Sequence, residues 1–309
     1  MKSIATLTMN PTIDVAYETD CVRPTLKMRT RSESYAPGGG GINVARVFVR
    51  LGGNARCIYL SGGATGPAFD GLVDLHQLVR TRIPIEGHTR VATTARDAES
   101  GQEYRFTPGG PTVSESEWQA CLDSVATIEC GFLVASGSLP PGVPTDFYVR
   151  VAKIARDRGI GFVLDTSGAP LKQALAAGGI LLAKPSHGEF AQLIGRKPES
   201  PADIANEAQN FVRDGKVEML AVTMGHRGAV LATRDATVCL RAIDIAPQSA
   251  VGAGDSFVAG MVHRLACGDD PRTAFRYGMA AGSAAVLTPG SSLAYPEDIA
   301  RLLPSVPLP

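Results

Sequence analysis

Short apolar runs alternate with longer, helically periodic segments along most of this 309-residue chain. The runs have the length of buried strands, and the longer segments place apolar residues on one helical face. This alternation is typical of βαβ units, which build a mostly parallel sheet covered by helices on both faces. We therefore predict an α/β fold with strands at 4–8, 55–60, 132–136, 161–165, 180–183 and 220–223, and helices at 42–51, 145–158, 202–214 and 256–266.

Two segments, 14–36 and 88–107, break this rhythm because polar and apolar residues alternate in them. Alternation with period two predicts half-exposed antiparallel strands. We expect these strands to form a small β-sheet lid on the main domain. Since the sequence has no internal repeat and no Pro/Ser-rich linker, residues 1–309 are expected to form a single domain that includes this lid.

The net charge and the cysteine content limit the kinds of partner and the cellular location that we expect for this chain. Thirty basic and thirty acidic residues cancel, so no net charge attracts nucleic acid or an anionic membrane. The N-terminal apolar run is too short for a secretory signal, and no run reaches the roughly 20 apolar residues of a membrane-spanning helix. Six scattered cysteines without a C-x-x-C pair are typical of reduced thiols. We expect a cytoplasmic protein that acts on small molecules.

Glycine is enriched where ligands should bind. The chain has 34 glycines where average usage predicts roughly 22, and several cluster before predicted helices. Parallel sheets bind ligands at the carboxyl ends of their strands, in the loops that lead to helices. Glycine there lets backbone N–H groups approach an anion closely.

One such cluster carries the main chemical hypothesis. Gly252, Ala253 and Gly254 lie at the start of the predicted helix at 256–266. Their N–H groups and the positive end of the helix dipole suit the charge that develops on a transferring phosphoryl group. Asp255 would then be the carboxylate base in the same turn. The alternative is an ordinary Asp cap after a glycine turn.

A second cluster, four consecutive glycines at 38–41, precedes another helix. Gly39 leaves room for a ligand, and Asn43 offers a donor and an acceptor to sugar hydroxyls. Asp14, after the first strand, could accept bonds from the same hydroxyls. The alternative for the glycine cluster is a flexible turn with Asn43 at the start of the helix. The alternative for Asp14 is a solvated carboxylate in a loop.

Two loops are candidates for nucleotide binding. Lys184 and Ser186 lie where a strand meets a helix, and Glu189 could orient Mg²⁺ through water. Ser186 and Glu189 also match a capping box, which needs no metal. In the second loop, Thr223, Gly225 and Gly228 would allow backbone contact with a nucleotide, or would form a simple tight turn.

Four cations in the predicted lid could grip a phosphate that is already present on the sugar. They are Lys27, Arg29, Arg90 and Arg105. The alternative is a solvated, charged lid face. Other nucleotide-dependent classes are excluded, because the sequence lacks a G-x-x-x-x-G-K-[ST] loop, the H-R-D and D-F-G motifs, and a G-x-G-x-x-G after the first strand.

Taken together, these motifs resemble the ribokinase-like carbohydrate kinases of the PfkB family over nearly the whole chain. GAGDS at 252–256 is similar to the family's C-terminal signature, and PGGGGINVAR at 37–46 to its N-terminal glycine signature. The resemblance implies a three-layer α/β/α fold with a small β-sheet lid, ATP and Mg²⁺ as co-substrate and cofactor, Asp255 as the base and Gly252–Gly254 as the anion hole.

Within the family, the chain is most similar to the minor bacterial 6-phosphofructokinases, through TLTMNPTID at 6–14, KMR at 27–29 and SGSLPPG at 136–142. Related kinases of fructose 1-phosphate and tagatose 6-phosphate usually have Lys where Gly40 stands. The similarity implies a homodimer formed through the lid. It also implies sugar contacts from Asp14, Gly39, Asn43 and Ser138, and phosphate contacts from Lys27, Arg29, Arg90 and Arg105.

Departures from the family pattern concern the nucleotide and a monovalent cation. Ser186 and Gly188 replace the usual Asn and Lys, which bears on nucleotide contacts at 186–188. A potassium site is implied at Ser249, Val251, Ala285 and Gly290, although Thr288 and Ser292 differ from the closest pattern.

The expected reaction is therefore phosphoryl transfer from ATP to O1 of fructose 6-phosphate. The alternatives are a 1-phosphofructokinase, a tagatose-6-phosphate kinase, or a non-catalytic sugar-phosphate sensor that retains the fold.

Overall fold

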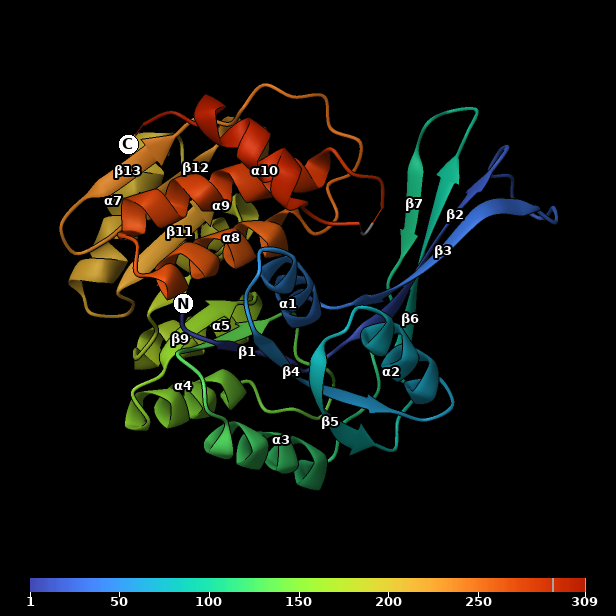
Figure 1. Ribbon diagram of the computed structural model, residues 1–309, viewed down its shortest axis with the longest axis horizontal. Helices are drawn as coiled ribbons and strands as arrows, with labels where there is room; N and C mark the ends of the chain where they lie inside the picture. Colours follow the sequence, from blue (N-terminus) through green and yellow to red (C-terminus); the bar gives the residue numbers. More distant parts are fainter. Residues whose placement is uncertain (291, 309) are drawn as a thin grey trace.

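The computed structural model describes residues 1–290 and 292–308. Its main body is a sheet of nine strands between two layers of helices, and a four-stranded sheet projects from one side (Figure 1). The order across the large sheet is β13-β12-β11-β10-β9-β8-β1-β4-β5. These strands are β1 (Ile4–Thr8), β4 (Ala55–Gly62), β5 (Val79–Ile85), β8 (Phe132–Ser136), β9 (Gly161–Asp165), β10 (Leu182–Ala183), β11 (Met219–Thr223), β12 (Ala229–Ala232) and β13 (Thr237–Leu240).

Helices cover both faces of this sheet because its strands are apolar on both sides. One face packs on α1 (Gly40–Arg50), α2 (Gly66–Leu75), α8 (Ala253–Cys267), α9 (Pro271–Val286) and α10 (Pro296–Leu302). The other face packs on α3 (Glu115–Thr127), α4 (Phe147–Asp157), α5 (Gly168–Ala177), α6 (His187–Ile194) and α7 (Pro201–Arg213). Two 3₁₀ turns, Gly225–Arg227 and Leu303–Ser305, complete the elements.

The strand pairings put the functional loops at one edge. From β5 to β11 every neighbouring pair is parallel, whereas β11–β12 and β12–β13 are antiparallel. The carboxyl ends of β1, β8, β9, β10 and β11 therefore meet at the same edge. The loops that follow these strands are those in which the sequence placed the candidate residues.

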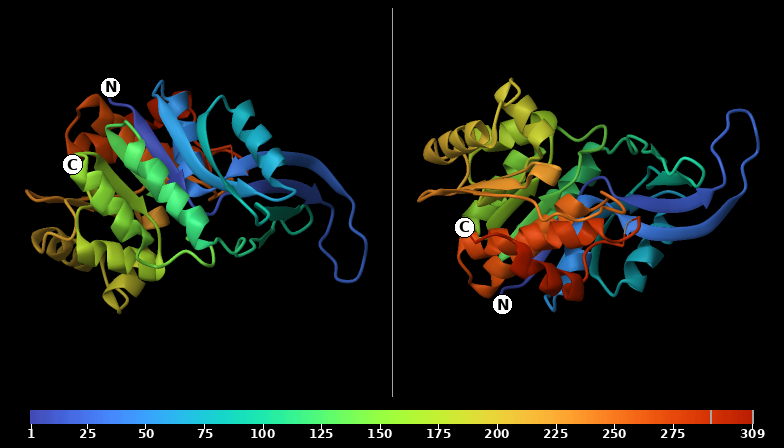
Figure 2. Two further views of the ribbon diagram at one scale, coloured as in Figure 1. Left: turned by 90° about the horizontal axis from the view of Figure 1, so that it is seen from below. Right: turned by 90° about the horizontal axis from the view of Figure 1, so that it is seen from above.

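The projecting sheet is the predicted lid, but it is not wholly antiparallel as expected, because its two central strands, at 12–19 and 90–97, pair in parallel. Its order is β3-β2-β6-β7, with β2 (Thr12–Thr19), β3 (Thr30–Gly38), β6 (Arg90–Asp97) and β7 (Glu103–Phe106). Figure 2 shows it extending well beyond the main body. The register places Asp14, Arg90 and Arg105 on one face, and Tyr35 and Phe106 on the other.

All six strands and four helices predicted from the periodicity are present, with shifted ends. Strand β10 is only two residues long, whereas four were expected, because the chain bends at Leu181 and the strand begins at Leu182 instead of Ile180. The helix expected at 256–266 begins at Ala253, so the glycine motif forms its first turn. Strands β5, β12 and β13 of the large sheet were not predicted individually. Within the described residues, the structure has no helix with the length and apolar character that crossing a bilayer requires.

Candidate active site

The GAGD motif forms the first turn of α8. Gly252, the N-cap residue, has φ 70°, a left-handed conformation that glycine adopts without strain. Ser256 N–H closes the first bond of the helix on Gly252 O (2.8 Å). The N–H groups of Ala253, Gly254 and Asp255 therefore face the helix end and can bind an anion.

Asp255 does not act as the cap, because Gly252 holds that position and the Asp255 side chain points to other elements. Its Oδ2 accepts from Asn43 Nδ2 of α1 (2.9 Å), and its Oδ1 accepts from Ser136 Oγ at the end of β8 (3.5 Å). Burial, followed by the nearby negative charge of Asp165, raises the pKa of Asp255 to about 6. A partly buried carboxylate with this pKa is suited to take a proton near neutral pH.

A buried ion pair lies beside the base. Lys184 Nζ contacts Asp165 Oδ1 at 3.1 Å, and the two side chains are only 6% and 13% exposed. Burial alone would lower the pKa of the Lys184 amine, but Asp165 and Glu189 outweigh it and the pKa is raised. A Cβ added at Gly254 would lie 3.3 Å from Lys184 Nζ. The ammonium therefore lies against the proposed anion hole, where it can contact a nucleotide phosphate.

The glycine loop before α1 is packed too closely for side chains. At Gly38 an added Cβ would lie 2.2 Å from Asp14 Oδ2, and at Gly40 it would lie 2.1 Å from Ser136 Oγ. Gly39 has φ 107°, which side chains rarely adopt. A lysine at position 40, as in the related sugar-phosphate kinases, would require Ser136 to move. This loop therefore places Asp14 and Asp255 in the same region of the molecule.

Asp14 lies on β2, on the lid face that carries Arg90 and Arg105. Burial raises the pKa of the Asp14 carboxyl to about 6, against the opposing charges of Arg46 and Arg90. Arg90 also donates to Asn10 O and Pro108 O, both at 2.8 Å, and so fixes the base of the lid. Asp14 and Arg90 are thus brought together as predicted.

Of the other residues predicted to contact the sugar phosphate, Ser138 lies at the site, whereas Arg105 is paired with another residue. The hydroxyl of Ser138, after β8, accepts from Asn10 Nδ2 at 3.2 Å and lies at the same sheet edge. Arg105 is on the face of Asp14 but pairs with Glu103 (2.7 Å).

Lys27 and Arg29 lie outside this group. They are exposed at the far end of the lid, in the segment between β2 and β3. Thr19, at the end of β2, is already about 17 Å from Asp14, at roughly 3.3 Å per residue. Within one chain, the structure therefore does not join these two cations to the site.

The first nucleotide loop adopts the capping box that was the alternative to metal binding. Ser186 N–H donates to Glu189 Oε2 (2.7 Å), and Glu189 N–H donates to Ser186 Oγ (3.4 Å). Ser186 also forms an isolated parallel bridge with Thr223, so the two predicted nucleotide loops are adjacent. The capping bond fixes the Glu189 carboxylate at the sheet edge that carries Lys184.

The second nucleotide loop is a tight turn. Gly225 has φ 58° and begins a 3₁₀ turn, and Gly228 has φ 101°. A Cβ at Gly228 would lie 2.0 Å from Leu240 O. Gly228 is thus required by the approach of β13, whereas Gly225 has open space beside it.

The predicted monovalent-cation residues come from two segments that meet. Ser249 N–H donates to Val286 O (3.3 Å), next to Ala285, and Ser249 Oγ accepts from Val251 N–H (3.2 Å). The Ala285 carbonyl already accepts from Thr288 Oγ (2.8 Å). The same carbonyl also accepts from Thr288 N–H (3.3 Å), so both of its lone pairs are engaged, and potassium could bind there only by displacing one of these bonds.

Magnesium has one carboxylate ligand candidate here. Among the described residues, no group of three or more His, Cys, Asp or Glu side chains is arranged to hold a metal. Glu189, the carboxylate predicted to orient magnesium, fits an ion that keeps most of its water and is bound mainly through nucleotide phosphates.

Three residues of the site were not anticipated from the sequence. Ser136 and Asp165 are the last residues of β8 and β9, and Arg46 lies one turn after Asn43 on α1. The first two ended predicted strands at the edge where ligands bind, so their position was a usable signal. For Arg46 the sequence carried no comparable signal.

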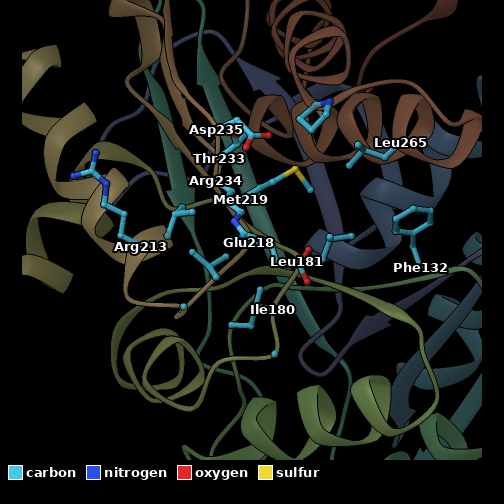
Figure 3. Close-up of a pocket in the computed structure, with 15 residues that line it drawn as sticks. Phe132, Ile180, Leu181, Arg213, Glu218, Met219, Thr233, Arg234, Asp235 and Leu265 are labelled. Atoms are coloured by element: carbon cyan, nitrogen blue, oxygen red, sulfur yellow. The ribbon is translucent and has the colours of Figure 1, made fainter.

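A separate cavity of about 940 Å³ lies at the opposite edge of the large sheet (Figure 3). Phe132, Leu181 and Met219 line it from the amino ends of β8, β10 and β11, and Arg234 and Asp235 from the turn after β12. Among the described residues that line it, none belongs to the predicted site. The cavity and the candidate active site are therefore separate features of the molecule.

Comparison with known proteins agrees with this geometry. The model of the pfkB family carbohydrate kinases matches residues 7–298. The ATP-dependent 6-phosphofructokinase isozyme 2 of Mycobacterium tuberculosis is 39% identical over 300 residues, covering 96% of this chain and 88% of that protein. The isozyme 2 of Escherichia coli is 37% identical over 305 residues, covering 98% of both chains.

Solved structures match over the same span. The phosphofructokinase-2 from Escherichia coli in complex with potassium superposes with a TM-score of 0.94 at 36% identity and 99% coverage of both chains. Its complex with fructose-6-phosphate gives 0.93 at 35% identity, also with 99% coverage of both chains. The ribokinase-like fold expected from the sequence is thus confirmed. By motif, fold and relatives, this chain belongs to the pfkB family of carbohydrate kinases.

Proposed function

We propose that this chain is an ATP-dependent 6-phosphofructokinase, which transfers the γ-phosphoryl group of ATP to O1 of fructose 6-phosphate. The observation that carries the proposal is Asp255, held by Asn43 and Ser136 beside the helix-end amides of α8. Asp255 takes the proton of the O1 hydroxyl as O1 bonds to phosphorus and ADP leaves. The amides stabilise the charge on the phosphoryl oxygens.

The remaining residues bind and orient the substrates. Asp14 accepts bonds from sugar hydroxyls, and Arg90 meets the sugar phosphate with the N–H groups that its bonds to Asn10 O and Pro108 O leave over. Lys184, against the anion hole, contacts the nucleotide phosphates. Glu189 would hold Mg²⁺, which when bound would supply positive charge to the nucleotide phosphates. ATP and a sugar phosphate are the expected ligands. Potassium at Ser249 and Ala285 is proposed only as an activator.

The pH profile follows from the base. Because Asp255 must be ionised to accept a proton and its pKa is raised to about 6, kcat should fall as pH drops through 6. Below that value the fall approaches about tenfold per pH unit. We expect this limb when kcat is measured at saturating substrates from pH 5 to 8, with circular dichroism confirming an intact fold. A flat profile down to pH 5 would contradict the assignment.

The substrate assignment is tested by ADP release on three sugars: fructose 6-phosphate, fructose 1-phosphate and tagatose 6-phosphate. The highest kcat/KM is expected for fructose 6-phosphate, since Gly40 leaves Ser136 in place where the other kinases usually have lysine. A preference for either other sugar would make this chain one of those kinases. Tight sugar-phosphate binding without ATP turnover would instead indicate a sensor.

The lid supports a homodimer as the proposed assembly. Its face opposite Asp14 exposes large apolar side chains, among them Tyr35 (58%) and Phe106 (62%). Apolar side chains gathered on one sheet face are typical of an association surface. The lid of a second copy, packed on this face, would cover these side chains. Lys27 and Arg29 at the tip of one lid could then reach the site of the other chain, although they cannot reach the site of their own.

We expect Phe106→Glu to convert the dimer to a monomer, because it places a charge in the apolar interface. Sedimentation velocity measures the change. Leu75→Glu, which alters an even more exposed apolar residue on α2, should leave the dimer intact. A dimer that persists in Phe106→Glu and dissociates in Leu75→Glu would place the interface elsewhere.

A further inference from the structure

Arg46 is a buried cation behind the site that the proposed reaction does not use. It lies on α1, one helical turn after Asn43, and only 4% of its surface is exposed. Its Nη1 donates to Asn43 Oδ1 and to Pro37 O, both at 3.3 Å. Arg46 thus ties the glycine loop, which starts after Pro37, to the residue that contacts the base.

The chemistry of these groups fixes the orientation of the Asn43 amide. A guanidinium has only donors, so the atom of Asn43 that faces it must be the oxygen. An ionised carboxylate has only acceptors, so the atom that faces Asp255 must be the nitrogen, as found at 2.9 Å. Without Arg46, the amide could turn over and present its oxygen to Asp255, which would repel the ionised base.

The charge of Arg46 also reaches two carboxylates from different elements, although Asp165 and Lys184 act more strongly on Asp255. Asp14 on β2 and Asp255 on α8 face it, as do Tyr295 before α10, Arg50 on α1 and His76 after α2. Burial, and then Arg50, lowers the pKa of Arg46 to about 10, so it is still charged at neutral pH. Among the nearby charges that lower the pKa of Asp14, Arg46 has the largest effect.

We propose that Arg46 is a positioning residue that holds the Asn43 amide against Asp255 and supplies one cation shared by Asp14 and Asp255. The proposal rests on the kinase function argued above. It separates two contributions, a hydrogen bond that orients Asn43 and a charge that favours the ionised base.

Two variants distinguish these contributions. Arg46→Gln can still donate to Asn43 but has no charge, so the acid limb of kcat should move to higher pH. Arg46→Lys retains the charge but loses the planar fork, so its limb should stay at the parental pH while kcat falls about tenfold. A uniform fall in kcat at every pH in both variants would leave Arg46 with a structural role only and overturn the proposal.

Arg276→Met is the matched control. Arg276, on α9, is also a carbonyl-binding arginine, with bonds to Val306 O (2.9 Å) and Pro307 O (3.0 Å) near the end of the chain. Its loss should not move the acid limb, since none of these contacts involves Asn43, Asp14 or Asp255. A limb that moved equally in Arg276→Met would show that the effect is not specific to position 46.

A readout without turnover separates this inference from the proposed function. In protein with ¹³C-labelled aspartate carboxyls, the Asp255 signal is assigned by its absence in Asp255→Asn and titrated without substrates. Its titration should shift upward in Arg46→Gln and stay in place in Arg46→Lys. If the parental chain fails to phosphorylate fructose 6-phosphate, the proposed function fails, but this titration still decides the role of Arg46. An unshifted Asp255 signal in Arg46→Gln would overturn the proposal for Arg46.

Discussion

Asp255→Asn should lower kcat by about 10²–10⁴, the usual contribution of a general base. The amide keeps the size of the carboxylate and can still contact Ser136, so the anion hole at Gly252–Gly254 should survive. What is lost is the group that accepts the O1 proton. Steady-state kinetics with ATP and fructose 6-phosphate measure the effect, and KM for the sugar should change much less than kcat.

Asp270→Asn is the matched control for this substitution. Asp270 is also an aspartate at a helix N-terminus, where it caps α9 by accepting from Arg272 N–H (2.9 Å) and Thr273 N–H (3.2 Å). Asn caps helices about as well as Asp, so this variant should retain parental kcat. If Asp255→Asn turned over at the parental rate, another group would have to be the base.

The second large effect is expected on stability. Lys184→Met removes one partner of the buried pair with Asp165 and leaves an uncompensated carboxylate at the base of the site. Breaking such a pair from one side typically costs about 3–5 kcal/mol of unfolding free energy. Urea unfolding monitored by circular dichroism should show it. Activity should fall as well, because the ammonium beside Gly254 is absent.

Two further variants test whether the effect comes from burial. Lys184→Met combined with Asp165→Leu removes both charges and should recover most of the stability without restoring activity. Lys153→Met breaks the exposed pair with Asp157, whose side chains are 69% and 52% exposed, and should leave stability nearly unchanged. Equal losses in Lys184→Met and Lys153→Met would contradict a buried, interdependent pair.

The fold was largely predictable because its signals are local. Each buried strand of a parallel sheet is a continuous apolar run, and each covering helix has an apolar face of period 3.6, so both can be recognised without knowing their neighbours. The GAGD motif was predictable for the same reason, since a glycine turn, a helix start and a carboxylate are adjacent in sequence. Strands β12 and β13 were harder, because they are short and pair only with each other and β11.

The network around the base could not be predicted, because its members are joined only by folding. Asn43 and Asp255 are 212 positions apart in sequence, and Ser136 and Asp255 are 119 apart. The sequence also could not decide between a capping box and a metal ligand at Glu189, since both use the same carboxylate. Lys27 and Arg29 were expected at the site because they lie in the predicted lid and because the resemblance implies it, but the length of β2 keeps them away from the site within one chain.

The lid and helix α1 are one uninterrupted stretch of chain. Strand β3 ends at Gly38 and α1 begins at Gly40, so a single glycine separates a lid strand from the helix that carries Asn43. A rocking of the lid as a sugar enters would therefore be transmitted as torque on the first turn of α1. Because Asp14 lies on the strand that pairs with β3, and α1 carries the Asn43 that contacts Asp255, the sugar-binding strand and the proton acceptor are linked through Gly39.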